Sequence, residues 1–244
     1  MWYNDENSTY KHAGERLKTL CYIAGAGEFS GRKLPSPDDY IIAADAGYAQ
    51  LISRGITPDL VVGDFDSLTV MPEHPNIISS PSEKDDTDMM LAVRQGLSRG
   101  YKSFLIDGGL GGRLDQSIAN IQILSYLAQN GAGGILLGRG VCVAAVMDGC
   151  VSFRAGTSGT ISVFCAGDKA EGVTLTGLKY PLRDAELTGS YPLGVSNEFT
   201  GAPASVSVRA GILLITWTDE PECLGAYGQI STTTSTKTIV PSSP

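Results

Sequence analysis

The first half of the chain alternates short apolar runs with segments of helical periodicity, and this alternation constrains the fold more than any other feature. Buried strands of a parallel sheet read as short apolar runs, and helices connect one such strand to the next. Strands that alternate with helices in this way predict βαβ units and a parallel sheet. The apolar runs are Leu20–Ala24, Tyr40–Ala44, Leu60–Val62, Ile77–Ser79 and Phe104–Ile106.

Two of the intervening segments carry apolar residues at helical spacing. Met90, Val93 and Leu97 recur in this way after an acidic stretch, which predicts a helix there. A second helix is expected further along the chain, with one face formed by Leu114, Ile118, Ile121 and Leu124.

The second half of the chain changes character near Asp148. Short runs rich in β-branched residues follow one another, separated by turn residues and without an amphipathic helix pattern. This pattern predicts an all-β sandwich or barrel of antiparallel strands. We therefore expect an α/β N-terminal domain with a mostly parallel sheet, followed by an all-β C-terminal sandwich domain. The expected ranges are a polar N-terminal extension at 1–18, the α/β domain at 19–147, the sandwich at 148–222 and a low-complexity tail without regular structure at 223–244.

Charge and cysteine content argue against several classes of protein. The 244 residues include 18 basic and 26 acidic side chains, and the formal charge of −8 opposes binding to nucleic acid or to an anionic membrane. The polar N-terminal residues do not resemble a signal peptide, and the longest apolar stretch, Gly134–Met147, is shorter than the ~20 residues that span a bilayer. The five scattered cysteines fit free thiols in a reducing compartment. We expect a cytoplasmic protein that binds neither nucleic acid nor membranes.

Acidic residues follow several of the predicted strands. Asp45 follows the second strand, and Asp64 and Asp66 follow the third. The loops after parallel strands emerge at one edge of the sheet, where ligands of open α/β folds bind. Asp85 and Asp88 open the next helix at the same end. Each group also has a purely structural interpretation, a polar turn for the first acids and a capping box or helix-dipole complement for the second.

Together, these carboxylates favour a cation site. Four or five carboxylates at one edge of a sheet would repel one another strongly without a cation. The chain has only two histidines, both in polar surroundings, so oxygen ligands remain, and these suit Mg²⁺ or Mn²⁺. Because protein-bound magnesium usually also binds substrate phosphates, we expect a phosphate-bearing substrate.

The segment GGLGGRLDQ, at residues 108–116, offers a complementary anion site directly after Asp107. Its glycines let backbone N–H groups approach an anion, the following helix presents its positive end, and Arg113 can bind phosphate oxygens. The chain lacks the P-loop pattern GxxxxGK followed by Ser or Thr. The segment AGAGEFSG after the first strand does not have the GxGxxG spacing of a dinucleotide site.

Five motifs occur in order along the chain, namely GDFDS (63–67), KDDTD (84–88), GGRLDQ (111–116), GLKYPL (177–182) and SNE (196–198). Each is weak alone, but the ordered set resembles the thiamine pyrophosphokinase (thiamine diphosphokinase) family, from about Leu20 to Trp217. The resemblance implies an α/β domain, a β-sandwich and a homodimer whose active sites lie between subunits. It also implies Mg²⁺-dependent transfer of the pyrophosphoryl group of ATP to thiamine. The products would be thiamine diphosphate and AMP, formed by direct attack of the thiamine hydroxyl on the β-phosphorus.

The matching motif positions imply roles for individual residues. Asp64, Asp66 and Asp88 match the metal ligands of the family. Ser196 and Asn197 match positions that hydrogen-bond the thiamine pyrimidine. The other residues implied in catalysis or in nucleotide and phosphate binding are Asp45, Lys84, Asp85, Thr87, Gly111, Gly112, Arg113 and Asp115.

Within this set, Arg113 is implied as a phosphate ligand. Asp85 and Asp115 are our own candidates for the acceptor of the hydroxyl proton, and Asp115 is also implied as a contact of thiamine. The sequence departs from the family pattern at two positions. Ala46 stands where the motif ADGG has its first glycine, and Gln116 stands where the motif GGRxDH has histidine.

The opening motif admits two other interpretations. DFDSL resembles the DxD motif of haloacid dehalogenase-type phosphatases, in which the first aspartate, here Asp64, is the nucleophile. Against this, Leu68 stands where that family prefers Thr or Val, and the motif follows the third predicted strand instead of the first. The all-β second half also has no counterpart there. The other alternative is a non-catalytic sensor of nucleotide or thiamine, although simple binding does not need so many metal-directed carboxylates.

Overall fold

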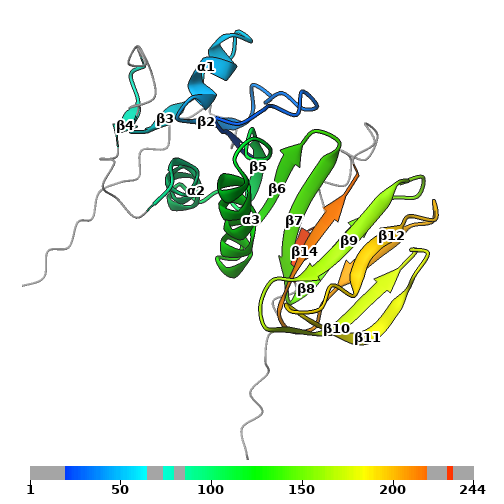
Figure 1. Ribbon diagram of the computed structural model, residues 1–244. Coiled ribbons are helices and arrows are strands. Elements are labelled where there is room, and N and C mark those ends of the chain that lie inside the picture. Colours follow the sequence, from blue (N-terminus) through cyan, green and yellow to red (C-terminus); the bar gives the residue numbers. More distant parts are fainter. Residues whose placement is uncertain (1–19, 65–73, 80–85, 219–229, 233–244) are drawn as a thin grey trace, which may run out of the picture.

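The computed structural model describes residues 20–64, 74–79, 86–218 and 230–232, which form two β-sheets and three helices (Figure 1). The larger sheet has ten strands. In chain order they are β1 (Cys21–Ala24), β2 (Tyr40–Ala44), β3 (Leu60–Gly63), β4 (Ile77–Ser79), β5 (Ser103–Asp107), β6 (Gly133–Gly138), β7 (Val141–Met147), β9 (Thr160–Cys165), β12 (Gly194–Glu198) and β14 (Ile212–Trp217).

Across this sheet the strands lie in the order β12-β9-β14-β7-β6-β5-β1-β2-β3-β4. The strands from β6 to β4 pair in parallel, and the remaining neighbours pair antiparallel. The expected mostly parallel sheet is therefore wrong, because a tight turn at Arg139 and Gly140 sends the chain straight back along β6. Strands from both sides of the expected boundary after residue 147 share this one sheet, and the domain ranges stay predictions.

The helices are α1 (Gly47–Ile52), α2 (Asp88–Ser98) and α3 (Leu114–Gln129). α1 and α2 pack on parallel strands, and α3 packs on β6 and on the antiparallel β7. Successive side chains of a strand point to opposite faces. On one face, Ile23 of β1 packs in a core with Val93 of α2 and Leu124 of α3. On the other face, Tyr22 packs in a core with Leu51 of α1. The parallel strands are thus buried on both sides, as their apolar sequences predict.

The face predicted for α3 is only partly correct. Leu124 is buried, but Leu114 and Ile118 are 74% and 50% exposed. Asn120 is the first buried residue of this helix, so the first turns of α3 project beyond its packed part.

The second sheet packs against the antiparallel part of the first. The apolar core between them includes Phe153, Phe199 and Trp217, and the Phe153 ring lies 5.0 Å from the Phe199 ring and 5.5 Å from the Trp217 ring. These two layers form a β-sandwich arrangement, although one layer includes β7, which lies before the boundary expected at residue 148. The spatial order is β11-β10-β13-β8-β15, with strands at β8 (Gly149–Phe153), β10 (Lys169–Thr176), β11 (Leu182–Thr188), β13 (Ala204–Ser207) and β15 (Ile230–Thr232).

Strand β15 lies in the tail that was expected to have no regular structure, and that expectation is wrong for these three residues. Ile230, Ser231 and Thr232 pair antiparallel with β8. Composition alone does not reveal this strand, because its pairing partner lies about 80 residues earlier in the chain.

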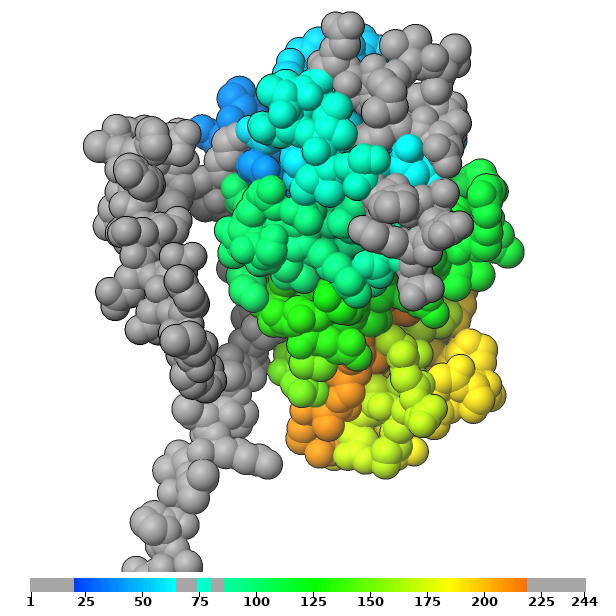
Figure 2. Space-filling view, turned by 90° about the vertical axis from the view of Figure 1, so that its left-hand side faces the viewer, coloured from blue at the N-terminus to red at the C-terminus, as the bar shows by residue number. Residues whose placement is uncertain are grey.

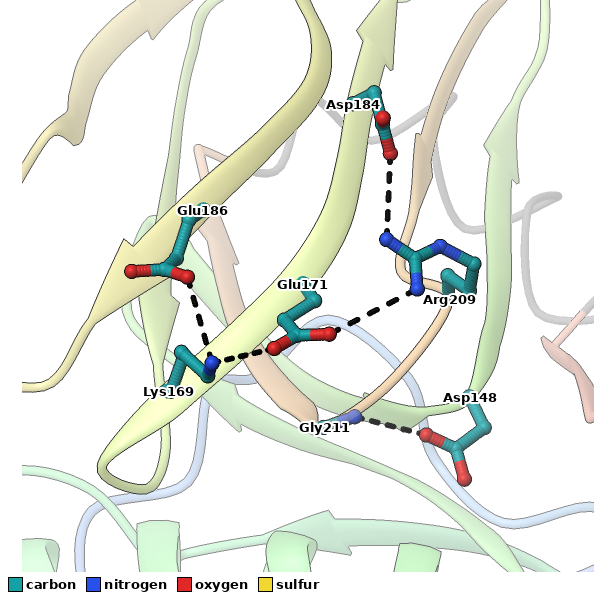
Figure 3. Close-up of polar contacts among 7 residues, drawn as sticks. All are labelled: Asp148, Lys169, Glu171, Asp184, Glu186, Arg209 and Gly211. Atoms are coloured by element: carbon teal, nitrogen blue, oxygen red, sulfur yellow. Dashed lines mark hydrogen bonds and ion pairs between the residues drawn. The ribbon is translucent and has the colours of Figure 1, made fainter.

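Charged residues at the sandwich surface form ion pairs and hydrogen bonds (Figure 3). Glu171 pairs with Lys169 (N–O 2.5 Å) and with Arg209 (3.8 Å), and Asp148 Oδ1 accepts a hydrogen bond from the Gly211 amide (2.9 Å). The paired side chains are 38–64% exposed. Since exposed ion pairs contribute little to stability, the apolar core holds the two sheets together.

The space-filling view shows the α/β part stacked directly on the sandwich (Figure 2). Within the described ranges, none of the helices combines the length and apolar character needed to cross a bilayer. The four cysteines of the described residues, among them the buried Cys21 and Cys142, are not joined by disulfide bonds, and Cys223 lies outside the described residues.

Candidate active site

The loops after β1, β2, β3 and β5 meet at the carboxyl edge of the parallel strands. Together with the first turns of α2 and α3, they line a cavity of about 580 Å³. This is the edge at which ligands bind in open α/β sheets. The prediction that the acids and the glycine loop lie together at this edge is confirmed for the described residues.

Three aspartates form the acidic wall of the cavity. Asp45 follows β2, Asp64 follows β3, and Asp88 is the first residue of α2. One carboxylate oxygen from each lies within 4.8 Å of the others. The resemblance implied Asp45 as a supporting acid, and the geometry places it inside the cluster. Asp66 lies outside the described residues, so its role as a metal ligand stays a prediction.

Electrostatics in this cluster favour a cation. Partial burial, together with the charges of Asp45 and Asp64, raises the pKa of Asp88 to about 6. A divalent cation between the three carboxylates would replace their mutual repulsion with attraction. Because the donors are all hard oxygens, the cluster fits Mg²⁺ or Mn²⁺.

The KDDTD motif combines a helix cap with the cluster. The Thr87 hydroxyl accepts a hydrogen bond from the Met90 amide (3.2 Å) and so caps α2. Asp86 pairs with Arg94 (2.7 Å). Asp88, directly after the cap, faces the cavity. The structural and the functional interpretations of this motif therefore both apply, to different residues, while Lys84 and Asp85 lie outside the described residues.

Two glycine loops also line the cavity. The Gly25 amide donates to the Asp107 carbonyl (2.7 Å), and the Gly27 amide donates to the Gly108 carbonyl (2.8 Å). A Cβ at Gly25 would lie only 2.6 Å from the Gly108 oxygen, so only glycine permits this backbone contact. The sequence analysis assigned no role to the first loop, AGAGEFSG, because its glycine spacing differs from GxGxxG. The rule that ligands bind at the carboxyl edge would have identified it.

Asp107 joins these two loops through hydrogen bonds. Its side chain is buried and accepts hydrogen bonds from the Ser30 amide (2.8 Å), the Ser30 hydroxyl (2.9 Å) and the Gly108 amide (2.8 Å). Burial raises the pKa of Asp107, and these hydrogen bonds oppose the shift. It does not belong to the residues that line the cavity. Asp107 is therefore a structural acid that joins the two loops.

Arg113 lies at the start of α3 and lines the cavity together with Gly111 and Gly112. Its guanidinium binds the Asp115 carboxylate through two hydrogen bonds, of 2.6 and 3.2 Å. This pairing raises the pKa of Arg113 and lowers the pKa of Asp115. Asp115 itself is not among the lining residues.

The sequence interpretation missed two cavity residues on α3. Gln116 was noted only as a departure from the family pattern, and Asn120 was not singled out, yet both line the cavity. The signal was available, because the two residues are four apart and therefore lie on one face of a helix that begins at the glycine loop.

Ser196 and Asn197 lie far from this cavity, on β12 at the opposite edge of the ten-stranded sheet. The Asn197 side chain is buried, its Oδ1 accepts from the Tyr180 amide (2.9 Å), and its Nδ2 donates to the Tyr180 carbonyl (2.7 Å). Ser196 is exposed, and its amide donates to the Ser162 hydroxyl (3.0 Å). Within one chain, the acids and the expected thiamine-binding residues do not come together.

Comparison with known proteins gives matches over both parts of the chain. The model of the thiamin pyrophosphokinase catalytic domain matches residues 32–134. The model of the thiamin pyrophosphokinase vitamin B1 binding domain matches residues 151–213. Together they cover about two thirds of the chain.

Individual relatives match over nearly their whole length. Thiamine pyrophosphokinase of Bacillus subtilis is 29% identical over 212 residues, which is 82% of this chain and 98% of that protein. Crystal structures of the enzyme from Bacillus subtilis (TM-score 0.72) and of the Geobacillus thermodenitrificans protein (0.70) are each 25% identical to this chain. They cover 83% and 84% of this chain and 100% of their own. Thiamin pyrophosphokinase from Candida albicans, at 15% identity, shares the fold (TM-score 0.64; 83% and 90% covered).

The two domain models follow one another in the same order as the α/β part and the sandwich. The three clustered aspartates and the glycine loop lie in or near the segment that matches the catalytic model, and β12 lies in the segment that matches the B1-binding model. This chain therefore belongs to the thiamine pyrophosphokinase family.

Proposed function

We propose that this protein is a thiamine diphosphokinase, which transfers the pyrophosphoryl group of ATP to thiamine. The observation that carries the proposal is the cluster of Asp45, Asp64 and Asp88, which lines one cavity together with the glycine loops in a chain of this family. Phosphoryl-type transfer depends mainly on positioning and charge neutralisation, and this cavity offers groups suited to both. A phosphatase with Asp64 as nucleophile and a non-catalytic sensor have no support among the relatives.

The acids of the cluster would hold Mg²⁺, with Asp66 as a further ligand. When bound, Mg²⁺ would neutralise charge on the phosphates of ATP. The amides of Gly111 and Gly112 would hold phosphate oxygens. Arg113 would exchange its bonds with Asp115 for bonds with a phosphate, which offers the same bidentate geometry.

The reaction proposed is a direct displacement at the β-phosphorus of ATP. The hydroxyl oxygen of thiamine forms a bond to that phosphorus, the bridging bond to the α-phosphate breaks, and AMP leaves. Asp85 and Asp115 are the candidate acceptors of the hydroxyl proton. Pairing with Arg113 lowers the pKa of Asp115 and makes it a weaker base while that pair persists. Because Arg113 would release Asp115 on binding a phosphate, Asp85 and Asp115 both stay candidates for the acceptor.

The topology supports a homodimer in which each active site uses both chains. Eight strand spacings separate β12 from β3, which at about 4.8 Å per strand corresponds to roughly 40 Å. A single thiamine cannot contact Ser196 or Asn197 and reach the acids of the same chain. Exposed apolar side chains on and beside β12, including Tyr180, Leu193 and Val195, offer a surface for a second copy. The free thiols fit the reducing cytoplasm as the site of action.

A product assay tests the proposed function. The protein is incubated with ATP, Mg²⁺ and thiamine, and the products are separated by chromatography. We expect AMP and thiamine diphosphate in equal amounts. Phosphate released from monoesters would favour the phosphatase, and binding of either substrate without turnover would favour the sensor. Either of these results would overturn the proposal.

A further inference from the structure

We propose that Asn120 reads the base of the bound nucleotide. Its Oδ1 would accept a hydrogen bond from the 6-amino group of adenine, which makes Asn120 a specificity-determining residue for ATP over nucleotides with a 6-oxo purine. The inference rests on the proposed function and adds a base-recognition site to it.

The position of Asn120 is unusual for a polar side chain. It lies in the second turn of α3, is only 5% exposed, and lines the cavity that holds the acids and the glycine loops. Buried amide groups are nearly always fully hydrogen-bonded. Among the described residues, no donor lies within hydrogen-bond distance of Asn120 Oδ1. A buried acceptor without a partner in a cavity wall points to a donor on the ligand.

The orientation of this amide is fixed by the glycine loop. Asn120 Nδ2 donates to the Gly109 carbonyl oxygen (2.8 Å). That oxygen can only accept, so turning the amide over would place two acceptors against each other. Nδ2 therefore stays on Gly109, and Oδ1 acts toward a ligand only as an acceptor.

The chemistry of the substrates selects the adenine amino group as the partner. A ribose hydroxyl both donates and accepts, so it needs no amide of fixed orientation. The amino group of thiamine has expected partners of its own, Ser196 and Asn197 on β12, which a second copy would bring to this cavity. Met89, which also lines the cavity, offers an apolar surface for a flat ring. The 6-amino group of adenine, an N–H donor on such a ring, matches this set of groups.

The consequence is selection of ATP, because a 6-oxo purine would leave Asn120 Oδ1 without a hydrogen-bond donor. Inosine and guanine nucleotides carry an oxygen where adenine carries its amino group, so this oxygen would face Oδ1 without a proton between them. Sites that hydrogen-bond one substrate group reject analogues in which the buried partner is left unpaired. Contacts with the triphosphate would not offset this loss, because adenine and 6-oxo purine nucleotides carry the same triphosphate.

The test compares ATP with inosine triphosphate as the donor in wild-type protein and in Asn120→Leu, a change of similar size that removes the acceptor. For the wild type we expect kcat/KM to favour ATP by about 10- to 100-fold. In Asn120→Leu we expect this ratio to fall below about threefold, mainly through loss with ATP. The matched control is Asn130→Leu, the same change at the far end of α3, which should leave the ratio at the wild-type value. Binding of AMP and IMP by calorimetry provides a second readout that does not need turnover.

Two results would overturn the inference. An equal loss with ATP and inosine triphosphate in Asn120→Leu would mean that Asn120 only supports the Gly109 loop. A change in the preference for thiamine over its 4-oxo analogue oxythiamine, without a change in the ATP preference, would assign Asn120 to thiamine. If Asn120→Leu does not fold, Asn120→Ser takes its place. If wild-type protein makes no thiamine diphosphate while still preferring AMP over IMP, the proposed function fails and the base site stands.

Discussion

At the scale of single residues, the described aspartates include some that support the fold through hydrogen bonds or ion pairs and three that gather in the cavity. Asp107 accepts several hydrogen bonds in a buried position, and Asp86 pairs with Arg94. Asp45, Asp64 and Asp88 instead crowd like charges together. Because crowded like charges cost folding free energy unless a cation neutralises them, this second group has the character of a binding site.

The substitution Asp45→Asn separates a metal site from a polar turn. It removes one of three repelling charges, so we expect the metal-free protein to melt at a higher temperature than the wild type. We also expect a smaller increase in melting temperature on addition of Mg²⁺, because one ligand is weakened. Thermal melts with and without Mg²⁺ measure both effects. An unchanged Mg²⁺ response in Asp45→Asn would contradict the assignment of Asp45 as a metal ligand. The control is Asp38→Asn, the same change on an exposed loop.

The raised pKa of Asp88 predicts how the stability of the metal-free protein depends on pH. Between its ordinary value of 3.8 and about 6, the folded chain holds a proton that the unfolded chain releases. Stability from this group is therefore present at low pH and is lost as pH rises through about 6. Comparing denaturant unfolding of Asp88→Asn with that of the wild type across pH 4 to 7 isolates this contribution. A wild-type advantage over Asp88→Asn that grows with pH in this window would contradict the shift.

At the scale of elements, the apolar runs predicted the parallel strands β1 to β5, and helical spacing predicted α2 and α3. The sixth parallel strand, β6, was not predicted as a separate strand. The direction of β7 was not predictable from its composition. A central antiparallel strand covered on both faces has the same apolar sequence as a parallel one, and only the tight turn after β6 sets its direction. The exposure of Leu114 and Ile118 was not predicted, because helical periodicity does not show where the surface that a helix packs on ends. The short β15 was not predicted either, because composition does not show which distant strand a segment pairs with.

The start of α1 depends on a close backbone contact. A Cβ at Gly47 would lie 2.1 Å from the Ala24 carbonyl oxygen, so Gly47→Ala forces α1 away from β1. We expect the free energy of unfolding to fall by about 1–3 kcal/mol, as for other overpacked sites, and Mg²⁺ binding to weaken because Asp45 lies two residues earlier.

The control is Gly167→Ala, where an added Cβ meets no atom within 4 Å. It should change stability by no more than about 0.5 kcal/mol. Denaturant unfolding of both variants measures the difference, and equal stability of the two would show that α1 adapts without cost.

At the scale of the whole molecule, the sequence predicted which residues gather in the cavity. It did not predict that the residues on β12 lie far from that cavity. Asp45, Asp64, Asp88, Arg113 and the glycines lie in one cavity because parallel strands bring their loops to one edge. The residues on β12 lie at the opposite edge of a sheet that runs across both parts of the chain. That separation follows from strand order, which no local sequence pattern encodes.

A mixing experiment tests whether two chains share each site. Asp64→Asn and Asn197→Ala should each abolish turnover as homodimers. When the two variants are mixed and allowed to exchange subunits, half of the dimers are mixed, and each of these contains one intact site. We expect about one quarter of wild-type activity to return. The control is the double variant mixed with Asp64→Asn, which should stay inactive, and the absence of recovery in the first mixture would contradict shared sites.

The fate of the phosphates of ATP tests the central claim most directly. The protein is given thiamine, Mg²⁺ and ATP labelled on both its β- and γ-phosphates, and the labelled products of a single turnover are separated. We predict that both labels appear in thiamine diphosphate and that the AMP is unlabelled. Label in ADP together with thiamine monophosphate, or in free phosphate, would contradict pyrophosphoryl transfer by this protein.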